Sequence, residues 1–346
     1  MVPTLTNDVE LLTILLEDAK TQPALYNPGP YWHLKSKIAA NQIRRHGIED
    51  FRGYKSSIGT SFADNVYVDT RNALDHGARR PFKFLLERVF PFADIFNAQV
   101  RLTMAHAKAA MQARHAAMRD SARTHYLLAR YKMPPSTLGG CVDAFELNGD
   151  VIAASYLSLL DTHDRIAQSI DFKSARCLFE IGGGFGVNVH LLLENYPRLR
   201  KVAYLDIPPN LYVGTQYLRA LYGDAVRDYR TTRLASSLTF ATDDELEILA
   251  IAPWQIEQLQ VDVDIFYNAH SFVEMSRPIV SNYVEKILQL QRRRRSLLAL
   301  VTYEGFDPST TIPPDELPGF FAGRLFERST FPITGATFGA IAFVSP

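Results

Sequence analysis

Short apolar runs alternate with amphipathic stretches through the second half of the chain. The predicted strands cover residues 177–181, 199–206, 261–270, 297–301 and 338–344. Residues 187–196 and 211–222 have the spacing of amphipathic helices, whereas residues 240–251 fit either a helix or a strand. Strands that alternate with helices indicate a parallel sheet with crossover helices, so we predict an α/β fold.

The first half of the chain has helical periodicity instead. Apolar residues between positions 11 and 16 form one face of a helix, and the alanine-rich stretch Pro91–Tyr131 is the strongest helical signal, because alanine favours helices. The segment Pro134–Gly140 interrupts this pattern. We therefore predict a mainly helical region over residues 1–170, which caps the substrate or mediates oligomerisation, and a sheet domain over residues 171–346.

A glycine-dense turn follows the first predicted strand, in the stretch Glu180-Ile181-Gly182-Gly183-Gly184-Phe185-Gly186. Glycine admits positive φ and lets a ligand approach the backbone without meeting a Cβ atom. A second acid, Asp206, ends the next predicted strand, 26 positions after Glu180. Because an acid at that place can accept hydrogen bonds from both ribose hydroxyls, we expect a nucleoside-type cofactor at the carboxyl ends of the strands.

The glycine spacing does not match the fingerprint of a dinucleotide-binding site. Dinucleotide-binding proteins carry G-x-G-x-x-G, in which a helix N-terminus faces a pyrophosphate. Here Gly182, Gly184 and Gly186 give G-x-G-x-G, and the acid stands before the glycines. The pattern therefore favours close approach of an uncharged part of a ligand over phosphate binding.

Hydrogen-bonding side chains gather at the end of the predicted fourth strand. They are Asn268, His270, Ser271 and Glu274. Ligands of a parallel sheet bind outside the carboxyl ends of its strands, so these side chains are candidates for the groups nearest the reacting atoms. A polar turn whose side chains satisfy one another is the alternative interpretation.

Two further clusters have simpler explanations. Tyr26, Tyr31 and Trp32 could line a pocket, but large aromatic side chains more commonly pack, and we expect that role for them. Arg292–Arg295 resemble a nucleic-acid patch. They end a predicted helix, however, where the helix dipole favours cations, so we assign them to that helix end.

Composition and charge narrow the classes of function. The 37 Lys and Arg residues balance the 37 Asp and Glu residues, so no net field draws the chain to nucleic acid or to an anionic membrane. The two cysteines make no disulfide framework, and no Cys or His cluster has metal-ligand spacing. The N-terminus lacks a basic signal-peptide region, and no apolar run reaches the roughly 18 residues of a membrane span. We therefore expect a cytoplasmic protein without a metal, nucleic-acid or membrane partner.

The pattern E-x-G-x-G-x-G, with an acid after the second strand, resembles the first motif of class I S-adenosylmethionine-dependent methyltransferases. This resemblance implies a Rossmann-like, mostly parallel sheet with an antiparallel last strand and, here, an N-terminal helical extension. It further implies that Glu180, Gly182, Gly183 and Gly184 hold the methionine part of the cofactor. Asp206 then holds the ribose.

A narrower resemblance covers residues 140–345. The motif I stretch, Leu205–Pro208 and Asn268–Met275 together are similar to the sugar O-methyltransferase family. In methyltransferases the loop after the third strand packs on the adenine ring, which implies that role for Pro253 and Trp254, with Asn268 as a further cofactor contact. Some sugar methyltransferases bind a divalent metal through paired acids after the fourth strand, and this chain lacks that pair.

These features predict an S-adenosylmethionine-dependent O-methyltransferase that acts on a hydroxyl of a small molecule, such as a sugar or a glycosylated metabolite. A hydroxyl is a poor nucleophile until its proton is removed, so His270 is the expected base, and Glu274 orients it or acts in its place. Two other functions stay open. A non-catalytic scaffold of the same fold would assemble through the N-terminal helices, which could also form a homo-oligomer, and a nicotinamide-dependent oxidoreductase would share the sheet.

Overall fold

A computed structural model describes most of the chain. The described residues are 3–52, 93–133, 137–291, 296–303, 312–321, 325–332 and 338–345. The arginine run at residues 292–295 lies outside these ranges. The chain divides into two compact units, one of Met1–Ala40 with Ser158–Pro346 and the other of Asn41–Leu157. The boundary at residue 170 falls inside the first unit, and the role of residues 1–170 as a cap or an oligomerisation surface stays a prediction.

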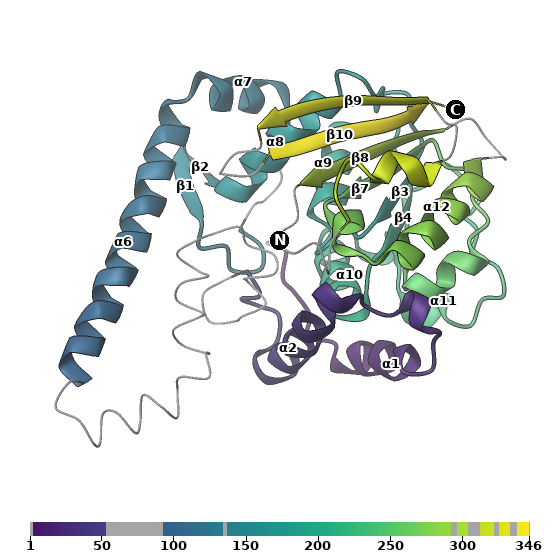
Figure 1. Cartoon of the computed structure of the whole chain (residues 1–346), viewed down its shortest axis with the longest axis horizontal. Helices are drawn as coiled ribbons and strands as arrows, with labels where there is room; N and C mark the ends of the chain where they lie inside the picture. The colour runs from purple at the N-terminus through teal and green to yellow at the C-terminus, as the bar shows by residue number, and fades with distance from the viewer. Residues whose placement is uncertain are drawn as a thin grey trace. The chain divides into compact units, whose positions relative to one another are not determined.

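The first unit contains a large, mostly parallel sheet (Figure 1). Its described strands are β3 (Cys177–Ile181), β4 (Lys201–Leu205), β5 (Val226–Arg227), β6 (Glu247–Ile251), β7 (Ile265–Ala269), β8 (Leu297–Tyr303), β9 (Leu325–Pro332) and β10 (Phe338–Ser345). They lie in the order β5-β6-β4-β3-β7-β8-β10-β9. The first six in this order are parallel, and β10 is antiparallel to both β8 and β9.

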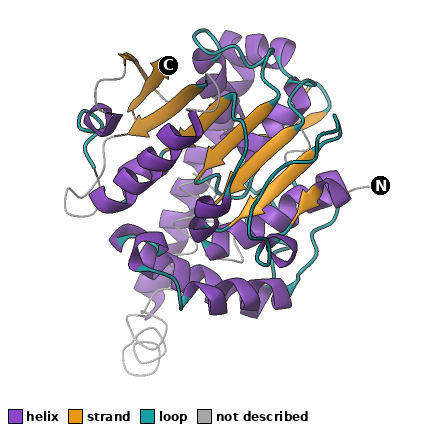
Figure 2. Cartoon of the chain, turned by 90° about the vertical axis from the view of Figure 1, so that its right-hand side faces the viewer, coloured by secondary structure: helices purple, strands orange, loops and turns teal. Residues whose placement is uncertain are grey.

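This sheet confirms the predicted Rossmann-like architecture and refines it. The stretch 240–251, left open between helix and strand, provides β6. The last strand is antiparallel, as predicted, but it lies inside the sheet because β9 forms the edge beside it. Helices pack on both sides of the strands (Figure 2).

The helices of the first unit connect the strands or precede them. They are α1 (Val9–Ala19), α9 (Val187–Asn195), α10 (Pro208–Tyr222), α11 (Tyr229–Thr232) and α12 (Arg277–Gln291). Shorter 3₁₀ turns are η1 (Ala24–Tyr26), η2 (Gly223–Ala225), η3 (Pro253–Gln258), η4 (Ser271–Glu274) and η5 (Leu317–Phe321). Two helices, α2 (Pro30–His46) and α8 (Ala154–Ile166), contain the points at which the chain divides into units.

The strand order fixes where a ligand can bind. From β3 the chain adds β4 and then β6 on one side, and it afterwards crosses to add β7 and β8 on the other side. The direction of winding therefore reverses between β3 and β7, which are neighbours. In open α/β sheets such a switch point leaves a crevice at the carboxyl ends of the two strands. The glycine-dense turn follows β3, and the polar cluster follows β7, so both predicted stretches meet at this crevice.

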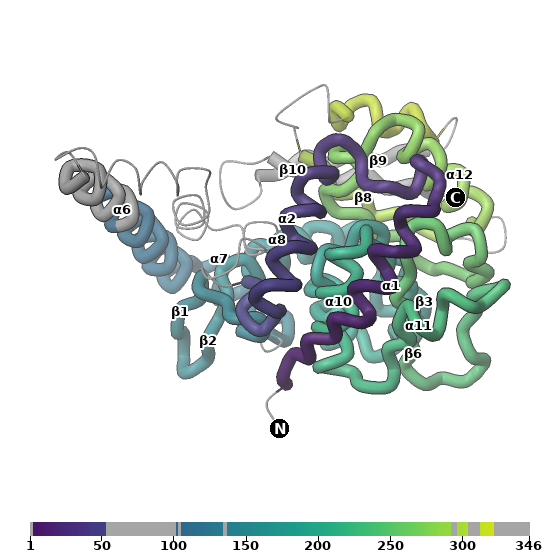
Figure 3. The backbone as a smooth tube through the Cα atoms, turned by 90° about the horizontal axis from the view of Figure 1, so that it is seen from below, coloured from purple at the N-terminus to yellow at the C-terminus, as the bar shows by residue number. Residues whose placement is uncertain are grey.

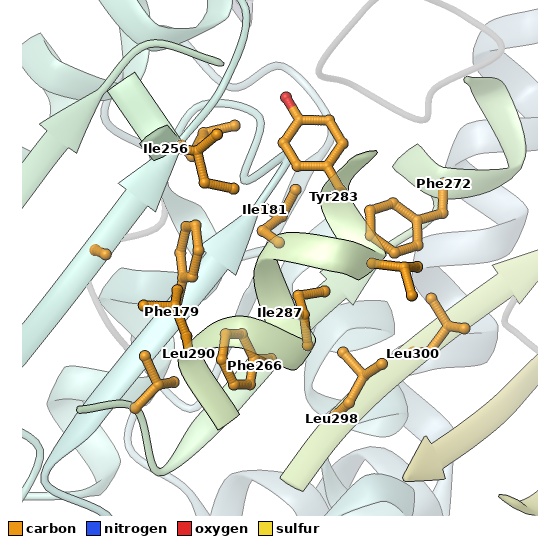
Figure 4. Packing of buried hydrophobic residues seen from close by; sticks show 14 of the residues in the cluster. Phe179, Ile181, Ile256, Phe266, Phe272, Tyr283, Ile287, Leu290, Leu298 and Leu300 are labelled. Carbon is orange, nitrogen blue, oxygen red and sulfur yellow. The ribbon is translucent and has the colours of Figure 1, made fainter. Parts of the chain in front are cut away.

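One face of the sheet packs on α12. Alternate residues of β3, Phe179 and Ile181, join Phe266 of β7 on this face, and Tyr283 and Ile287 of α12 lie against them (Figure 4). All five side chains are almost fully buried. Burial of each such side chain contributes about 1.5–3 kcal/mol, so this face holds the strands in register beneath the site.

The first helix is part of the sheet unit. Asp8 caps α1 by accepting a hydrogen bond from Leu11 N at 3.1 Å, and its carboxylate also pairs with Arg230 of α11 at 2.6 Å. At the other end of α1, Asp18 pairs with Arg233 at 2.9 Å. Figure 3 shows α1 lying along α10 and α11. These contacts explain why the first residues group with the sheet although they are far from it in sequence.

The described part of the second unit includes the helices α6 and α7 and a hairpin, besides the ends of α2 and α8. The predicted helix Pro91–Tyr131 is divided into α6 (Ala93–Asp120) and α7 (Ala122–Arg130), because the Ser121 hydroxyl caps a new helix start by accepting from Thr124 N at 3.4 Å. The hairpin pairs β1 (Ala144–Leu147) with β2 (Asp150–Ala153). Its turn has positive φ at Asn148 and Gly149, which is the hairpin geometry that Asn-Gly favours.

Candidate functional site

The glycine-dense turn needs its glycines for two different reasons. Gly182 and Gly184 both have positive φ, at 74° and 61°. A Cβ on Gly182 would lie 2.2 Å from Ser271 Oγ, so this glycine permits close packing between the ends of β3 and β7. A Cβ on Gly184 would meet no atom within 4 Å. Gly184 therefore leaves free space above the backbone, where a ligand can approach.

Asp206 ties this turn to the end of the second strand. Its Oδ2 accepts a hydrogen bond from Gly184 N at 2.6 Å, and its Oδ1 accepts one from Ile207 N at 2.7 Å. The Tyr204 hydroxyl donates to the Gly184 carbonyl at 2.5 Å and holds the turn from the other side. Only 5% of Asp206 is exposed. The acid predicted to bind a ribose is thus placed beside the glycines, and it also organises their backbone.

Glu180 lies under the turn in the body of the sheet. It stands in register with Tyr204 of β4 and Tyr267 of β7, so its carboxyl lies between two buried tyrosines. Its Oε1 accepts a hydrogen bond from Asn188 Nδ2 at 2.8 Å. Its Oε2 is buried and has no hydrogen-bond partner among the described residues. One lone acceptor of this acid is therefore available beneath the turn.

The two acids lack a compensating cation. Burial raises the pKa of Glu180 to about 7, and the nearby Asp206 adds to this rise. Burial also raises the pKa of Asp206 to about 7, although the hydrogen bonds from Gly184 and Ile207 favour its charged form. No basic side chain of the described chain lowers either value. A cationic ligand at this place would supply the missing charge.

Asn268 joins the two strands of the switch point. Its Nδ2 donates to the Ile181 carbonyl at 2.8 Å and to Ser271 Oγ at 2.5 Å, and its Oδ1 accepts from Phe272 N at 3.2 Å. The side chain is fully buried. These bonds give Asn268 and Ser271 a structural role, which matches the polar-turn interpretation. The expected cofactor contact of Asn268 stays a prediction.

His270 stands immediately after β7 in a strained conformation. Its φ is 69°, which is uncommon for a residue other than glycine, and its N–H donates to the Val301 carbonyl at 2.8 Å. The half-buried imidazole lies 5.4 Å from the Tyr303 ring, measured between centroids. Burial lowers the pKa of His270 to about 4, so the imidazole is neutral near pH 7 and can accept a proton.

Glu274 accepts hydrogen bonds from two aromatic side chains. Trp32 Nε1 donates to its Oε2 at 2.6 Å, and the Tyr303 hydroxyl donates to its Oε1 at 2.6 Å. Burial raises the pKa of Glu274, and both hydrogen bonds oppose that rise. The carboxylate therefore does not contact His270 directly, and Tyr303 lies between them.

The turn after β6 holds the predicted adenine contacts. Pro253 is buried at the start of η3, and Trp254 is half-buried behind it. Trp254 Nε1 donates to the Tyr229 hydroxyl at 3.0 Å, and that hydroxyl donates to Asp18 of α1 at 2.8 Å. The indole is thereby oriented by the first helix. The structure places both residues after the strand next to β4, and their contact with adenine stays a prediction.

Sequence reasoning missed several residues that shape this site. Trp32 was expected to pack, yet its indole N–H serves Glu274. Tyr204 offered a signal, since a tyrosine inside an apolar strand needs a partner for its hydroxyl, and it stands two positions before Asp206. Tyr303 and Asn188 gave no such signal in the sequence, because their partners Glu274 and Glu180 lie 29 and 8 positions away.

The described residues contain no group of three or more His, Cys, Asp or Glu side chains that could hold a metal ion. In the same part of the chain, no helix has both the length and the apolar character required to cross a membrane.

Comparisons with known proteins find structural similarity only. No protein-family model matches the chain, and no curated protein matches it. Among solved structures, the S-adenosylmethionine-dependent methyltransferase SibL is 17% identical with a TM-score of 0.37, and the match covers 56% of this chain and 57% of SibL. The chain therefore spans little more than half of SibL.

Two further structures are similar at the same level. A SAM-dependent methyltransferase from Aquifex aeolicus is 15% identical with a TM-score of 0.39, and the match covers 55% of this chain and 93% of that protein. An O-methyltransferase from Bacillus cereus, solved with SAH, is 14% identical with a TM-score of 0.35, over 56% of this chain and 82% of that protein. We base the functional assignment on the strand order and the site residues of this chain.

Proposed function

We propose that the protein is an S-adenosylmethionine-dependent methyltransferase. One observation carries this proposal: two buried carboxyls, Glu180 and Asp206, flank a glycine turn at the switch point of the sheet, and no cation among the described residues compensates them. A ligand with hydroxyls and positive charge would satisfy both acids. S-adenosylmethionine has a ribose, an ammonium group and a sulfonium, which is the combination that this donor set favours.

The site residues fit that cofactor in detail. Glu180 Oε2 is a buried acceptor without a partner among the described residues, so it can receive a hydrogen bond from a ligand. Gly184 leaves space above the turn, and Asp206 is held beside it by two backbone N–H groups. We assign the methionine part to Glu180 and the glycine turn, the ribose to Asp206, and the adenine to Pro253 and Trp254.

We further propose that the transferred methyl goes to a hydroxyl of a small molecule such as a sugar. When bound, the cofactor supplies an electrophilic methyl group on its sulfonium. The protein then has to orient the acceptor and remove its proton. His270 supports this assignment because it stands immediately after β7, beside the switch point. O-methylation and a sugar-like acceptor rest on the sequence resemblance.

Calorimetric titration of the full chain with S-adenosylhomocysteine, run beside NADH, tests the cofactor. We expect micromolar binding of the former and no heat from the latter. Binding of NADH alone would make the protein a nicotinamide-dependent enzyme. Binding of neither would favour a scaffold that uses the fold without the cofactor.

The His270→Ala variant tests the base. Loss of a general base commonly slows a reaction by about 10²–10⁴-fold, so we expect a decrease of that order in methyl transfer from radiolabelled S-adenosylmethionine to sugars in a screened panel. S-adenosylhomocysteine should bind the variant as it binds the unchanged protein. His106→Ala, an exposed histidine of α6, is the matched control and should keep full turnover. Full turnover in His270→Ala would exclude His270 as the base.

A further inference from the structure

Glu274 is held by side chains from two distant segments. Trp32 belongs to α2, which precedes the sheet by more than a hundred residues, and Tyr303 ends β8. Each donates to a different oxygen of the carboxylate, at 2.6 Å in both cases. Charge-assisted hydrogen bonds of this length are strong, and a bond to each oxygen fixes the plane of the carboxylate.

His270 is positioned against the same tyrosine. The imidazole and the Tyr303 ring lie 5.4 Å apart at an angle of 40°. The main chain holds the two residues together as well, because His270 N donates to Val301 O, two residues before Tyr303. Residues other than glycine keep a positive φ only where surrounding structure enforces it, and such positions cluster at functional sites. His270, with φ at 69°, is one of two in the described chain.

Glu274 has charged groups in its surroundings. Its charge makes a small contribution to the raised pKa of Asp206. Lys35 opposes the rise in the pKa of Glu274. The Lys35 ammonium lies 3.8 Å from the centre of the Tyr31 ring and 5.1 Å from the centre of the Trp32 ring, on the same helix. The start of α2 therefore contributes both a hydrogen bond and a cation to this side of the site.

We propose that Trp32 and Tyr303 are positioning residues for the base: Trp32 and Tyr303 fix the Glu274 carboxylate, and Tyr303, whose hydroxyl donates to that carboxylate, orients the His270 imidazole that lies against its ring. This inference rests on the proposed function, because it assigns His270 the proton of the acceptor. It places the N-terminal segment in the catalytic machinery of the sheet unit.

The arrangement has a clear consequence for proton transfer. As the acceptor oxygen forms its bond to the methyl carbon, the carbon–sulfur bond breaks and its electron pair stays on sulfur. The hydroxyl proton passes to an imidazole nitrogen of His270, which becomes positively charged. Tyr303, held through its hydrogen bond to Glu274, keeps the imidazole in one orientation during this transfer. Glu274 without its two donors would be free to turn away or to take up a proton.

Nuclear magnetic resonance on the ligand-free full chain tests the coupling without any acceptor. The chain has two tryptophans, so the two indole N–H signals are assigned with Trp32→Phe and Trp254→Phe. We expect the Trp32 signal to move as Glu274 titrates and to lose that movement in Glu274→Gln. The signal of the carbon-bound His270 imidazole proton, followed at pH 7, should shift in Trp32→Phe and in Tyr303→Phe, because both variants remove a hydrogen bond that holds the Tyr303 ring and Glu274 in place.

Trp254→Phe is the matched control, since it makes the same change of ring at the cofactor side. It should leave the His270 signal unchanged. Equal His270 signals in Trp32→Phe, Glu274→Gln and the control would overturn the proposal; Glu274→Gln keeps the shape of the side chain and guards against misfolding. S-adenosylhomocysteine binding separates the two ideas, since the proposed function fails if the unchanged protein binds none, whereas this coupling is read from the ligand-free chain.

Discussion

Carboxylates at the amino ends and at the carboxyl ends of the parallel strands have different partners. These two sides of the sheet are called the amino edge and the carboxyl edge below. At the amino ends of the strands, Glu247 accepts from Arg227 at 2.5 Å, from Lys201 at 3.5 Å and from the backbone N–H of Ala241 at 2.8 Å. At the carboxyl ends, Glu180 and Asp206 are as deeply buried and have no cationic partner in the described chain. Acids at one edge are neutralised by the protein itself, and those at the other edge are not.

Further acids at the amino edge follow the same rule. Lys201 donates to Asp243 at 2.9 Å and lowers the pKa of that carboxyl, and Asp264 accepts from the backbone N–H groups of Arg176 and Cys177. These residues surround a cleft of about 410 Å³. The cleft is polar, yet the acids named here already have partners, so we assign it no function.

This difference distinguishes buried acids whose charge the protein compensates from buried acids whose charge it leaves for a ligand to compensate. A buried charge that keeps its partners does not weaken the fold, whereas a buried charge without a partner costs free energy and shifts its pKa to stay neutral. Such groups persist at sites where a ligand provides the compensation. The contrast between the edges therefore marks the carboxyl edge as the binding edge, without reference to any other protein.

The largest expected effect is that substitutions at the two edges change the free energy of unfolding in opposite directions. Glu247→Gln should lower the free energy of unfolding by about 1–3 kcal/mol, because it leaves two cations without their charge partner. Glu180→Gln should raise it at pH 8 by a similar amount, about 1–3 kcal/mol, because it removes an uncompensated buried charge. Urea unfolding of the ligand-free protein measures both. A loss of stability in both variants would break the comparison.

The pH dependence of stability should be the next largest effect. The pKa values of Glu180 and Asp206 are raised to about 7 in the folded protein, from 4.5 and 3.8. The folded state therefore holds these protons more tightly, and the stability that they contribute is complete below about pH 4 and is lost as the pH rises through about 7. We expect the free energy of unfolding to fall by on the order of 2 kcal/mol for each acid between about pH 5 and pH 8.5.

Glu180→Gln provides the control for this titration, since a glutamine cannot ionise. Its unfolding curve should be flatter over the same range. An equally steep curve would assign the pH dependence to other groups.

Substitution of an acid should change the affinity for S-adenosylhomocysteine at the carboxyl edge only. Asp206→Ala removes the proposed ribose ligand and the anchor of the Gly184 backbone, so we expect its dissociation constant to rise at least about tenfold, or about 1.4 kcal/mol. Asp243→Ala makes the same change at the amino edge and should bind with the original affinity. Calorimetry compares the two, and equal affinities would remove the ribose role of Asp206.

The smallest expected effect is a change in cofactor affinity when Trp254, the proposed adenine contact, is substituted. Trp254→Phe keeps an aromatic ring but loses the hydrogen bond to Tyr229 that orients it. A lost neutral hydrogen bond is worth about 0.5–1.5 kcal/mol, so affinity for S-adenosylhomocysteine should fall by roughly three- to tenfold at most. Adenosine, measured in the same titration, should show the same ratio. An unchanged affinity for both ligands would place adenine elsewhere.

Local pattern was enough to predict β3, β4, β7, β8 and β10, the turn and its acids. Gly182 and Gly184 require positive φ because of their own positions in a tight turn, and Glu180 and Asp206 lie at strand ends because the apolar runs stop there. The parallel sheet followed from the alternation of strands and helices. Such features depend on neighbours in sequence, and short-range sterics and periodicity determine them.

Contacts between distant segments could not be read in this way. The sequence placed Asn268 near the cofactor and Trp32 in a packing cluster, whereas the structure commits the Asn268 amide to Ile181 and Ser271 and aims the Trp32 indole at Glu274. It also groups residues 1–40 with the sheet.

The sequence by itself determined which acids and glycines stand at the ends of which strands. Only the tertiary structure decided their electrostatic state and their partners. Burial raises the pKa of Glu180, which no cation of the described chain reaches, whereas Lys201 and Arg227 pair with Glu247. That difference arises from the packing of segments far apart in the chain, which no local pattern encodes.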